Sequence, residues 1–436
     1  MSKMDRRNFM KLTSAAGLAS AIPGLGNTSR AEVPGYDGPL YVCIQATGGW
    51  DPTSLCDPKG RHSDLDEFPM NMYRKEDIGE IGNLTYAPVP GLQAFFEKYY
   101  DRLLIVNGID TQTNGHDSGR RNCFSGNLIE GYPSFGALVS ASKSAQMPMG
   151  FITNGGYDDT GGLTAKTRVG NTNVLTRLAY PNKIVGAGGG GMGGGMNGGM
   201  GGQEPTFHSE AAQARISALR AQRLAAMRDN QKLPRYRHGM GMLFGAQSSE
   251  NQLTTLTDYL PDTLDNSGNP LRRQAQVAIA CYKAGLTVSA NLAMGGFDTH
   301  GNHDASHFPR MGQIVDGVDF LLTQAEEYDM ADKIVIMVGS DFGRTPGYNG
   351  NNGKDHWSIT SMFFAGAGIP GNRVIGGSDD GHVAYKYNPE TLEQDDNGIR
   401  ILPSHVHKAF RQATGIMGEV EEQAFPLDVD LLPIFT

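Results

Sequence analysis

The sequence predicts an α/β protein in which a mostly parallel sheet is sandwiched between helices, with a helical insertion. The main observation is that short, almost continuous apolar runs alternate with helical segments, a pattern typical of a parallel sheet covered on both faces. The second is size: 436 residues, 39% of them hydrophobic, suffice for one large α/β domain with an ample core. This composition excludes global disorder and a collagen-like or coiled-coil protein.

Strands are predicted where short apolar runs end at glycine or at a polar loop. The first, residues 39–46, reads P-L-Y-V-C-I-Q-A and ends before Gly48 and Gly49. Similar runs predict further strands at residues 102–109, 148–152, 287–294, 333–338 and 361–365. Because these runs are apolar along most of their length, we expect both faces of the sheet to be buried.

Helices are predicted between the strands, at residues 91–100, 133–143, 209–230, 272–283 and 310–328. Ser209 is a suitable N-cap for the third of them, since its hydroxyl can accept a hydrogen bond from the first helical turn. The stretch from about 205 to 285 is largely helical and lies between predicted strands. We interpret it as an insertion or lid within one domain.

Residues 186–202 consist almost entirely of glycine and methionine, with Met192, Met196 and Met200 four positions apart. Glycine loses the most backbone entropy on ordering, so this stretch is predicted to be a flexible loop. A soft-metal site built from the methionines is the alternative interpretation. We therefore expect a single domain at residues 32–436 that carries this loop and the helical insertion.

The first 31 residues have the features of an export signal. Arg6 and Arg7 precede a short, weakly apolar segment at residues 12–22, and the small residues Ser29 and Ala31 suit a signal peptidase. Paired arginines before such a segment resemble a twin-arginine signal. The expected partner is the twin-arginine translocase, which exports folded proteins, and the mature protein should be periplasmic or secreted, with no stable membrane span.

The chain is acidic, with a formal charge of −9. The predicted signal holds five cations and one anion, so the remaining 405 residues would carry −13. Such a body would repel polyanions, so we expect no nucleic-acid partner and favour a small or weakly charged substrate. A surplus of carboxylates also suits cation binding. None of the four cysteines forms a C-x-x-C pair, which argues against a thiolate zinc site.

Polar side chains collect after the predicted strands, where an open parallel sheet binds its ligands. The candidates are Asp51, Thr113, His116, Ser118, Asp298, His300, Asp341, Arg344, Asp355 and His356. Asp298 with His300, and Asp355 with His356, combine carboxylate oxygen with imidazole nitrogen, a donor set that suits a divalent metal ion. An aspartate after a strand can also be a simple turn former, which is the alternative for Asp51.

These ligands could surround two ions, which would clamp the attacking and leaving oxygens of a phosphoryl or sulfuryl transfer. Arg344 is predicted to pair with the transferred group or, as an alternative, to form a salt bridge with Asp341 or Asp355. We expect His303 and His307, in a polar segment, to be exposed.

Several motifs resemble the bacterial exported family called "domain of unknown function 1501", grouped with alkaline phosphatases, sulfatases and cofactor-independent phosphoglycerate mutases. They read G-G-W-D, H-D-S-G-R-R-N-C-F-S-G, G-G-F-D-T-H-G-N-H, S-D-F-G-R-T-P and G-K-D-H-W. The resemblance implies an alkaline-phosphatase-like sheet with a helical insertion. It also implies one or two bound divalent ions, such as Zn, Mn, Mg or Ca.

The resemblance further implies roles for individual residues. Metal would be bound by Asp51, Asp298, His300, Asp341, Asp355 and His356. Phe342 stands where superfamily enzymes have a histidine after the aspartate, and His116 is the candidate to replace it as a further ligand or a general base.

Candidates for a nucleophilic hydroxyl are Thr111, Thr113 and Ser118, although none lies in a motif that selects it. Hydrolysis through a metal-activated water and loss of the chemistry both remain open. The first hypothesis is thus an exported metal-dependent hydrolase of phosphate or sulfate esters acting on a small-molecule ester. The alternative is a non-catalytic, metal-stabilised exported scaffold or surface-assembly protein. A dinucleotide-binding oxidoreductase is disfavoured because no G-x-G-x-x-G follows the first strand.

Overall fold

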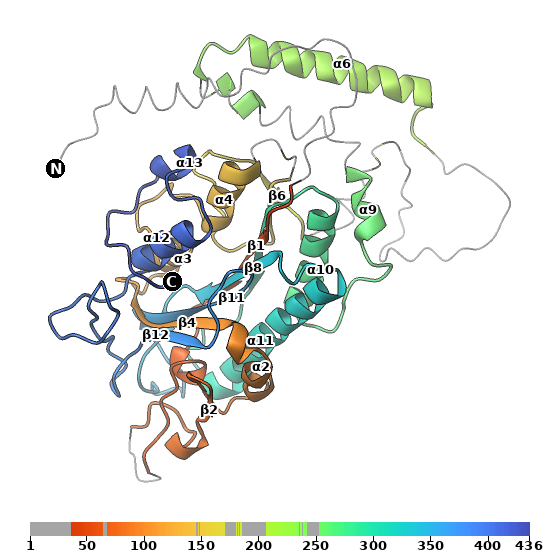
Figure 1. Ribbon diagram of the computed structural model, residues 1–436. Helices are drawn as coiled ribbons and strands as arrows, with labels where there is room; N and C mark the ends of the chain where they lie inside the picture. Colours follow the sequence, from red (N-terminus) through yellow and green to blue (C-terminus); the bar gives the residue numbers. More distant parts are fainter. Residues whose placement is uncertain are drawn as a thin grey trace, which may run out of the picture.

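A computed structural model describes residues 36–63, 68–144, 147, 149–170, 180, 182, 184, 206–234, 236–237, 239–241 and 253–436. Its centre is an eight-stranded sheet with the strand order β12-β4-β11-β8-β1-β7-β5-β6 (Figure 1). The strands are β1 (Leu40–Ala46), β4 (Leu103–Asp110), β5 (Phe151–Thr153), β6 (Lys166–Arg168), β7 (Ser289–Met294), β8 (Ile334–Ser340), β11 (Ile359–Gly366) and β12 (Arg373–Gly376).

The sheet is mostly parallel, as predicted. β1 pairs in parallel with β7 and β8, and β5 pairs in parallel with β6 and β7. β11 is the exception, because it runs antiparallel to both of its neighbours, β4 and β8. Two small antiparallel pairs lie outside this sheet: β2 (Gly79–Ile81) with β3 (Leu84–Tyr86), and β9 (Gly343–Arg344) with β10 (His356–Trp357).

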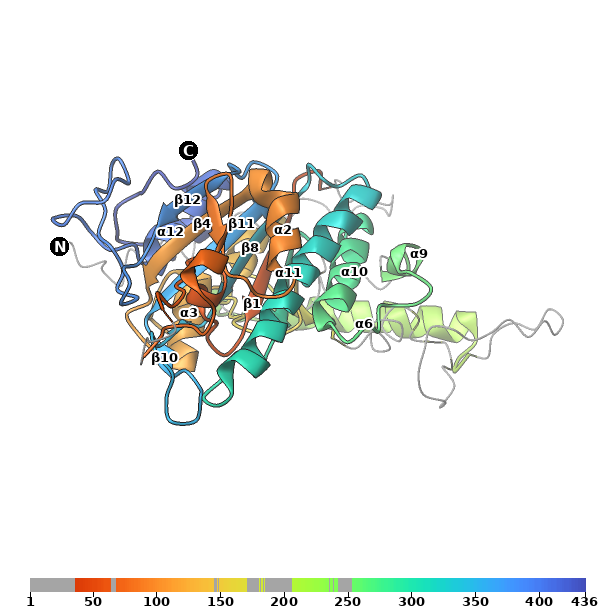
Figure 2. The ribbon, with the colours of Figure 1, turned by 90° about the horizontal axis from the view of Figure 1, so that it is seen from below.

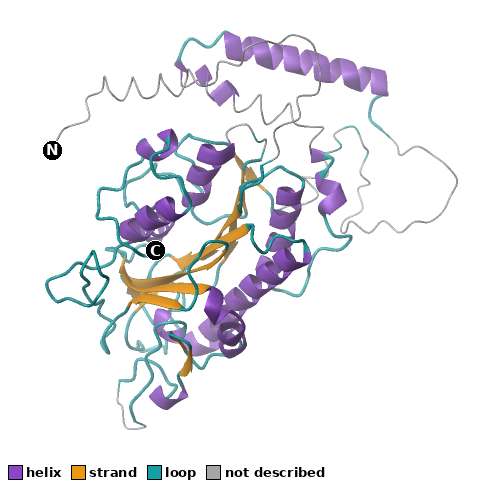
Figure 3. Cartoon of the chain, viewed as in Figure 1, coloured by secondary structure: helices purple, strands orange, loops and turns teal. Residues whose placement is uncertain are grey.

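Helices cover both faces of the sheet (Figure 3). In β1, Leu40, Val42 and Ile44 belong to one core cluster, whereas Tyr41 and Cys43 belong to the other, since successive side chains of a strand point to opposite faces. The first cluster includes residues of α2 (Leu92–Tyr99), α10 (Pro270–Lys283) and α11 (His303–Glu327). The second includes α3 (His116–Ser125), α4 (Phe135–Ser144) and α12 (Pro403–Ala413). Figure 2 shows α2, α10 and α11 together along one side of the sheet.

The predicted strands and helices are present with small differences at their ends. The prediction for residues 310–328 was too short, because α11 already begins at His303. The apolar pattern did not predict β6, β12, α3 or α12. The segment that forms α3 reads H-D-S-G-R-R-N-C-F-S and has almost no apolar stripe, so its helical character was not visible in the pattern.

Outside these layers lie α6 (Glu210–Asp229), α9 (Leu256–Tyr259), α13 (Val420–Gln423) and three 3-10 turns, η1 (Pro52–Ser54), η2 (Lys75–Asp77) and η3 (Tyr100–Arg102). Ser209 caps α6 as predicted, since its hydroxyl accepts a hydrogen bond from the backbone N–H of Ala212. The helix lies apart from the sheet and buries none of its side chains (Figure 1).

Two predicted segments, the export signal at residues 1–31 and the Gly/Met loop at 186–202, lie outside the described residues. Within the described part of the chain, none of the helices has the length and apolar character needed to cross a membrane.

Candidate metal centre

The site lies at the edge of the sheet where the parallel strands end. His116 opens α3 after the loop that follows β4, Asp298 follows β7, Asp341 follows β8, and His356 begins β10. Strand β11 leads away from this edge.

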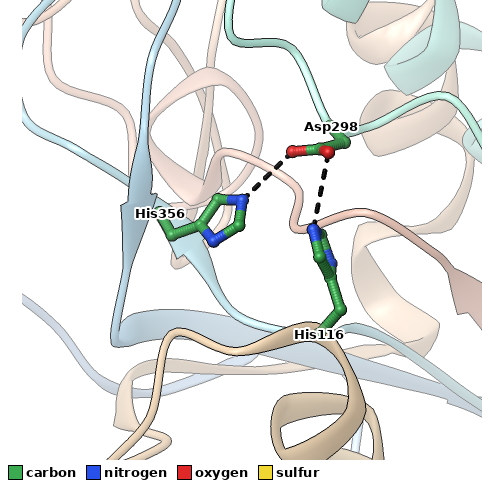
Figure 4. A group of neighbouring side chains, drawn as sticks. All are labelled: His116, Asp298 and His356. Carbon is green, nitrogen blue, oxygen red and sulfur yellow. Dashed lines mark hydrogen bonds and ion pairs between the residues drawn. The ribbon is translucent and has the colours of Figure 1, made fainter.

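Three side chains meet at this edge: His116, Asp298 and His356 (Figure 4). Each offers one ligand atom, and these atoms lie within 4.8 Å of one another. Nε2 of His116 is 3.4 Å from Oδ2 of Asp298, and Nε2 of His356 is 3.1 Å from Oδ1. The side chain of Asp298 is 46% exposed, so the group is open to solvent.

The two imidazoles are oriented by bonds on their other nitrogen. Nδ1 of His356 lies 2.7 Å from the backbone oxygen of Asn114, which can only accept, so Nδ1 carries the proton. Nδ1 of His116 lies 2.9 Å from Oδ2 of Asp341 and donates to that carboxylate. Both Nε2 atoms face Asp298, and in the neutral imidazole this is the nitrogen that carries the lone pair. A histidine fixed through Nδ1 in this way is typical of metal sites.

His300 completes the arrangement. Its Nδ1 is 2.6 Å from Oδ1 of Asp355, and its Nε2 is 3.0 Å from both Oδ1 of Asp298 and Nε2 of His356. Three imidazole nitrogens therefore face one carboxylate, and in neutral imidazoles bonded in this way each of these nitrogens accepts, as the carboxylate does. A positive charge between these atoms resolves the conflict. The mixed nitrogen and oxygen donor set fits a divalent ion such as Zn²⁺ or Mn²⁺.

Asp298 remains ionised because of its neighbours. Partial burial acts to raise its pKa, but hydrogen bonds from Arg344 and His356 outweigh burial and lower the pKa to about 2. Asp355 is also affected, since its hydrogen bond with His300 lowers its pKa. Both carboxylates therefore stay negative over the neutral range, as a cation site requires.

Arg344 is fully buried, and its guanidinium is occupied by groups of the protein itself. Nε donates to the carbonyl of Gly49, NH1 donates to the carbonyl of Lys354, and NH2 donates both to the carbonyl of Gly48 and to Asp298. The ion pair is thus with Asp298, and neither Asp341 nor Asp355, the two partners considered from the sequence, is the acceptor. In this position Arg344 holds Asp298 and does not reach solvent.

Asp341 lies behind His116. Its side chain is fully buried, and Oδ2 accepts hydrogen bonds from the backbone N–H of Gly48 and from His116, while Oδ1 has no partner among the described residues. Burial raises the pKa of this carboxyl above its ordinary value, although the hydrogen bond from His116 acts to lower it. The geometry places Asp341 as the residue that orients His116.

Asp51 does not join the cluster. Its carboxylate is fully buried and receives bonds from Lys354 Nζ at 2.6 Å, from the N–H and hydroxyl of Thr53, and from the hydroxyl of Ser54. Burial acts to raise the pKa of Asp51, yet Lys354 and His303 hold it well below its usual range. The structure thus separates Asp51 from the other predicted ligands and pairs it with a lysine that the sequence analysis did not consider.

The prediction that His303 and His307 are exposed was wrong, since both are completely buried. Nε2 of His307 accepts the backbone N–H of Asp51, so its Nδ1 carries the proton and donates to the hydroxyl of Thr299, 3.1 Å away. Nδ1 of His303 is 2.7 Å from the same hydroxyl. Burial lowers the pKa of both imidazoles. The sequence hint was their i,i+4 spacing, which places both on one face of a helix.

The predicted hydroxyl candidates lie between the end of β4 and the first turn of α3. The hydroxyls of Thr113 and Ser118 are 2.7 Å apart, and that of Ser118 also donates to the carbonyl of Gly115. Thr111 is buried, and its hydroxyl is bonded to backbone carbonyls. In the described part of the chain, none of the three hydroxyls has a hydrogen bond to the metal-centre residues.

Comparison with known proteins gives two results. The family model "Protein of unknown function (DUF1501)" matches residues 40–396, whereas no curated protein matches the chain. Solved structures with a similar arrangement include the PsFucS1 sulfatase from Pseudoalteromonas sp., at 10% identity and a TM-score of 0.39, covering 98% of this chain and 74% of the sulfatase. An alkaline phosphatase from the Antarctic bacterium TAB5 matches at 10% identity and a TM-score of 0.32, covering 76% and 92%. The lipoteichoic acid synthase LtaP from Listeria monocytogenes matches at 8% identity and a TM-score of 0.35, covering 99% and 80%.

Proposed function

This chain belongs to the family described as Protein of unknown function (DUF1501), and we propose that it is an exported metal-dependent hydrolase of phosphate or sulfate esters. One observation carries the proposal: the Nε2 atoms of His116, His300 and His356 all lie within 3.4 Å of a carboxylate oxygen of Asp298. The sequence resemblance to a superfamily of phosphatases and sulfatases supports the class of ester.

His116, Asp298 and His356 would hold the divalent ion, with zinc or manganese best suited to their donor atoms. A bound ion would supply a Lewis acid that polarises the ester and lowers the pKa of a water molecule. Asp341 and Arg344 would act behind these ligands, the first by orienting His116 and the second by holding Asp298 in place. Loss of such outer partners commonly weakens metal binding by about 10- to 100-fold.

His300 is the best candidate for proton transfer. Its side chain is 47% exposed, against 33% for His116 and 22% for His356, so it is the imidazole most accessible to a substrate. Asp355 lies against Nδ1, so Nε2 of His300, at the side of the metal centre, would be the nitrogen that takes a proton from water. An imidazole held by a carboxylate is the usual form of a general base.

The transfer is proposed to go directly to water. The hydroxyls of Thr113 and Ser118 bond to each other and to the turn before α3, so the geometry favours neither as a covalent nucleophile. With Arg344 enclosed, Arg120 is the candidate contact for the anionic oxygens of the substrate. It lies one turn after His116 in α3, donates to the carbonyl of that residue, and is partly exposed.

The export route remains part of the proposal. It rests on Arg6 and Arg7 ahead of the weakly apolar segment, and it names the twin-arginine translocase as the partner during export. A negatively charged mature body favours a small ester over a polyanion as substrate.

The test combines metal analysis with a panel of aryl phosphate and aryl sulfate esters. We expect one divalent ion per purified chain. Asp298→Ala should lose this ion, and its hydrolysis rate should fall by more than about 100-fold, because loss of a residue that only supports a ligand already costs up to about that factor. Glu130→Gln is the matched control, because this exposed carboxylate pairs with Arg121 and neither residue has a role in the proposed site. Activity undiminished in Asp298→Ala would reject the site. Bound metal without hydrolysis of any ester would support the scaffold alternative.

A further inference from the structure

A second group of polar side chains is buried beside the metal centre, around the ammonium group of Lys354. Nζ of Lys354 lies 2.6 Å from Oδ2 of Asp51 and 2.8 Å from Oδ1 of Asn71, and all three side chains are fully buried. The hydroxyl of Ser54 is 3.1 Å from both of these oxygens. We call Asp51, Ser54 and Asn71 the oxygen cage.

One further polar atom lies beside the cage. Nε2 of His303 lies 3.3 Å from Oδ2 of Asp51, is completely buried, and has no hydrogen-bond partner among the described residues. A carboxylate, an amide oxygen, a hydroxyl and an imidazole nitrogen are together a set of ligands for a divalent cation, with oxygen ligands of the kind that magnesium prefers. In this protein they surround a lysine.

We infer that the oxygen cage is a cation site filled permanently by the ammonium group of Lys354, so that the protein binds its metal only at the neighbouring histidine cluster. This inference rests on the proposed metal-dependent function. Asp51, which the sequence predicted to bind metal, would instead bind the ammonium group of Lys354. The expected number of bound ions is then one per chain, where the sequence allowed one or two.

The backbone connects the filled cage to the metal centre. Lys354 is followed directly by Asp355 and His356, and its N–H donates to the carbonyl of Thr299, the residue between Asp298 and His300. The two loops that carry these metal-centre residues are thus joined at Lys354, with the ammonium anchored inside the protein. A tethered charge keeps this anchor in place when free metal is scarce, which a second bound ion would not do.

The substitution Lys354→Met tests the inference, because it removes the ammonium and keeps a side chain of similar length. We expect the variant to gain a magnesium site, seen as a melting temperature that rises with magnesium concentration, since an ion that binds only the folded state stabilises it. The wild type should show no such rise. The double variant Asp51→Asn/Lys354→Met, which removes both charges, should also show none.

Ion counting by mass spectrometry separates this inference from the proposed function. The wild type, equilibrated with zinc and magnesium, should hold one ion, and His356→Ala should hold none. A second wild-type ion that Asp51→Asn removes would overturn the inference, as would a Lys354→Met variant that magnesium does not stabilise. If the wild type holds no ion but Lys354→Met responds to magnesium, the proposed metal centre fails while the assignment of the cage stands.

Discussion

Arg344 shows how one buried residue can organise a polar site. Its guanidinium donates hydrogen bonds to three parts of the chain: to a backbone carbonyl after β1, to a carbonyl in the loop before β10, and to the carboxylate of Asp298 after β7. Burial lowers the pKa of Arg344, against the effect of Asp298, yet an arginine remains charged at any accessible pH. The planar fork of donors can satisfy several acceptors at once, which a single ammonium group cannot do in the same geometry.

Arg344→Lys is therefore predicted to be costly, although the charge is kept. Buried carbonyls of Gly48, Gly49 and Lys354 would lose partners, and we expect the free energy of unfolding to fall by about 3 kcal/mol. Metal affinity should fall too, because Asp298 loses its anchor. Urea denaturation and calorimetric metal titration measure the two effects. Arg400→Lys, at a partly exposed pair with Asp110, is the control and should change neither by much. If Arg344→Lys had the stability and the metal affinity of the wild type, Arg344 would not be the residue that holds Asp298 and the surrounding loops in place.

Single residues also show why the site could be predicted only in part. The motifs placed Asp298, His300, Asp341, Asp355 and His356 near one sheet edge, and all five lie in or directly behind the cluster. Which atoms each side chain faces depends on its partners across the fold. No local pattern showed that Lys354 neutralises Asp51, because the two are 303 positions apart in the chain.

At the scale of elements, the position of α3 decides whether His116 reaches the metal centre. This helix packs closely on the end of β8, and a Cβ atom added at Gly119 would lie 2.4 Å from the carbonyl oxygen of Asp341 and 2.9 Å from the ring of Phe342. The glycine is therefore required by contact between elements, although glycine inside a helix is normally unfavourable.

Gly119→Ala tests this packing. In an open helix the change would stabilise the protein by up to about 1 kcal/mol. Here we expect it to push α3 away from Asp341, to destabilise the protein and to weaken metal binding through His116. Gly347→Ala, where a Cβ atom would meet open space, is the control. Thermal melting and metal titration give the answer, and a stabilised variant with unchanged metal affinity would show that the contact is unimportant.

α12 is joined to α3 by a buried imidazole. His407 is bonded through Nε2 to the carbonyl of Cys123 at 2.9 Å. Burial lowers the pKa of His407 from 6.5 to about 4, with a smaller opposing effect from that carbonyl. The folded protein therefore keeps this imidazole neutral at pH values where the unfolded chain would already be protonated.

This difference predicts how stability changes with pH. The contribution of neutral His407 to the free energy of unfolding is complete above pH 6.5. It is lost as the pH falls towards 4, because the unfolded chain binds a proton at this imidazole that the folded protein does not bind. Between pH 7 and pH 4.5 the expected loss is roughly 2 to 3 kcal/mol. His407→Gln should make the stability less sensitive to pH over this interval, measured by urea denaturation of metal-free protein. Equal pH slopes for variant and wild type would contradict the assignment.

At the scale of the whole molecule, the acidic body and the basic start of the chain are predicted to have separate roles. Arg6 and Arg7 are predicted to direct export of the folded protein, while the −13 charge expected after processing limits its partners.

The double variant Arg6→Lys/Arg7→Lys should stay in the cytoplasm with its first 31 residues attached, because the twin-arginine pair is lost while the charge is kept. Cell fractionation and the mass of the intact chain measure both outcomes. Lys11→Arg, which also keeps the charge but leaves the pair intact, is the control. Normal export and cleavage of the double variant would reject this route.

The sequence by itself determined the α/β class, most strands of the central sheet, the resemblance to the family and the group of polar residues at one edge. These features are local: buried parallel strands are short apolar runs, and the residues after them sit at the strand ends whatever the details of packing. The β9–β10 pair and the antiparallel direction of β11 were not visible in such runs.

Only the tertiary structure decided which polar residues meet. It brought His116, Asp298 and His356 together, buried His303 and His307, and placed Lys354 against Asp51. The physical reason is that charge pairing and side-chain direction depend on neighbours distant in sequence, and a buried carboxylate is stable only beside a compensating charge. At Asp51 that charge is a lysine, whereas at the histidine cluster we propose that it is a metal ion.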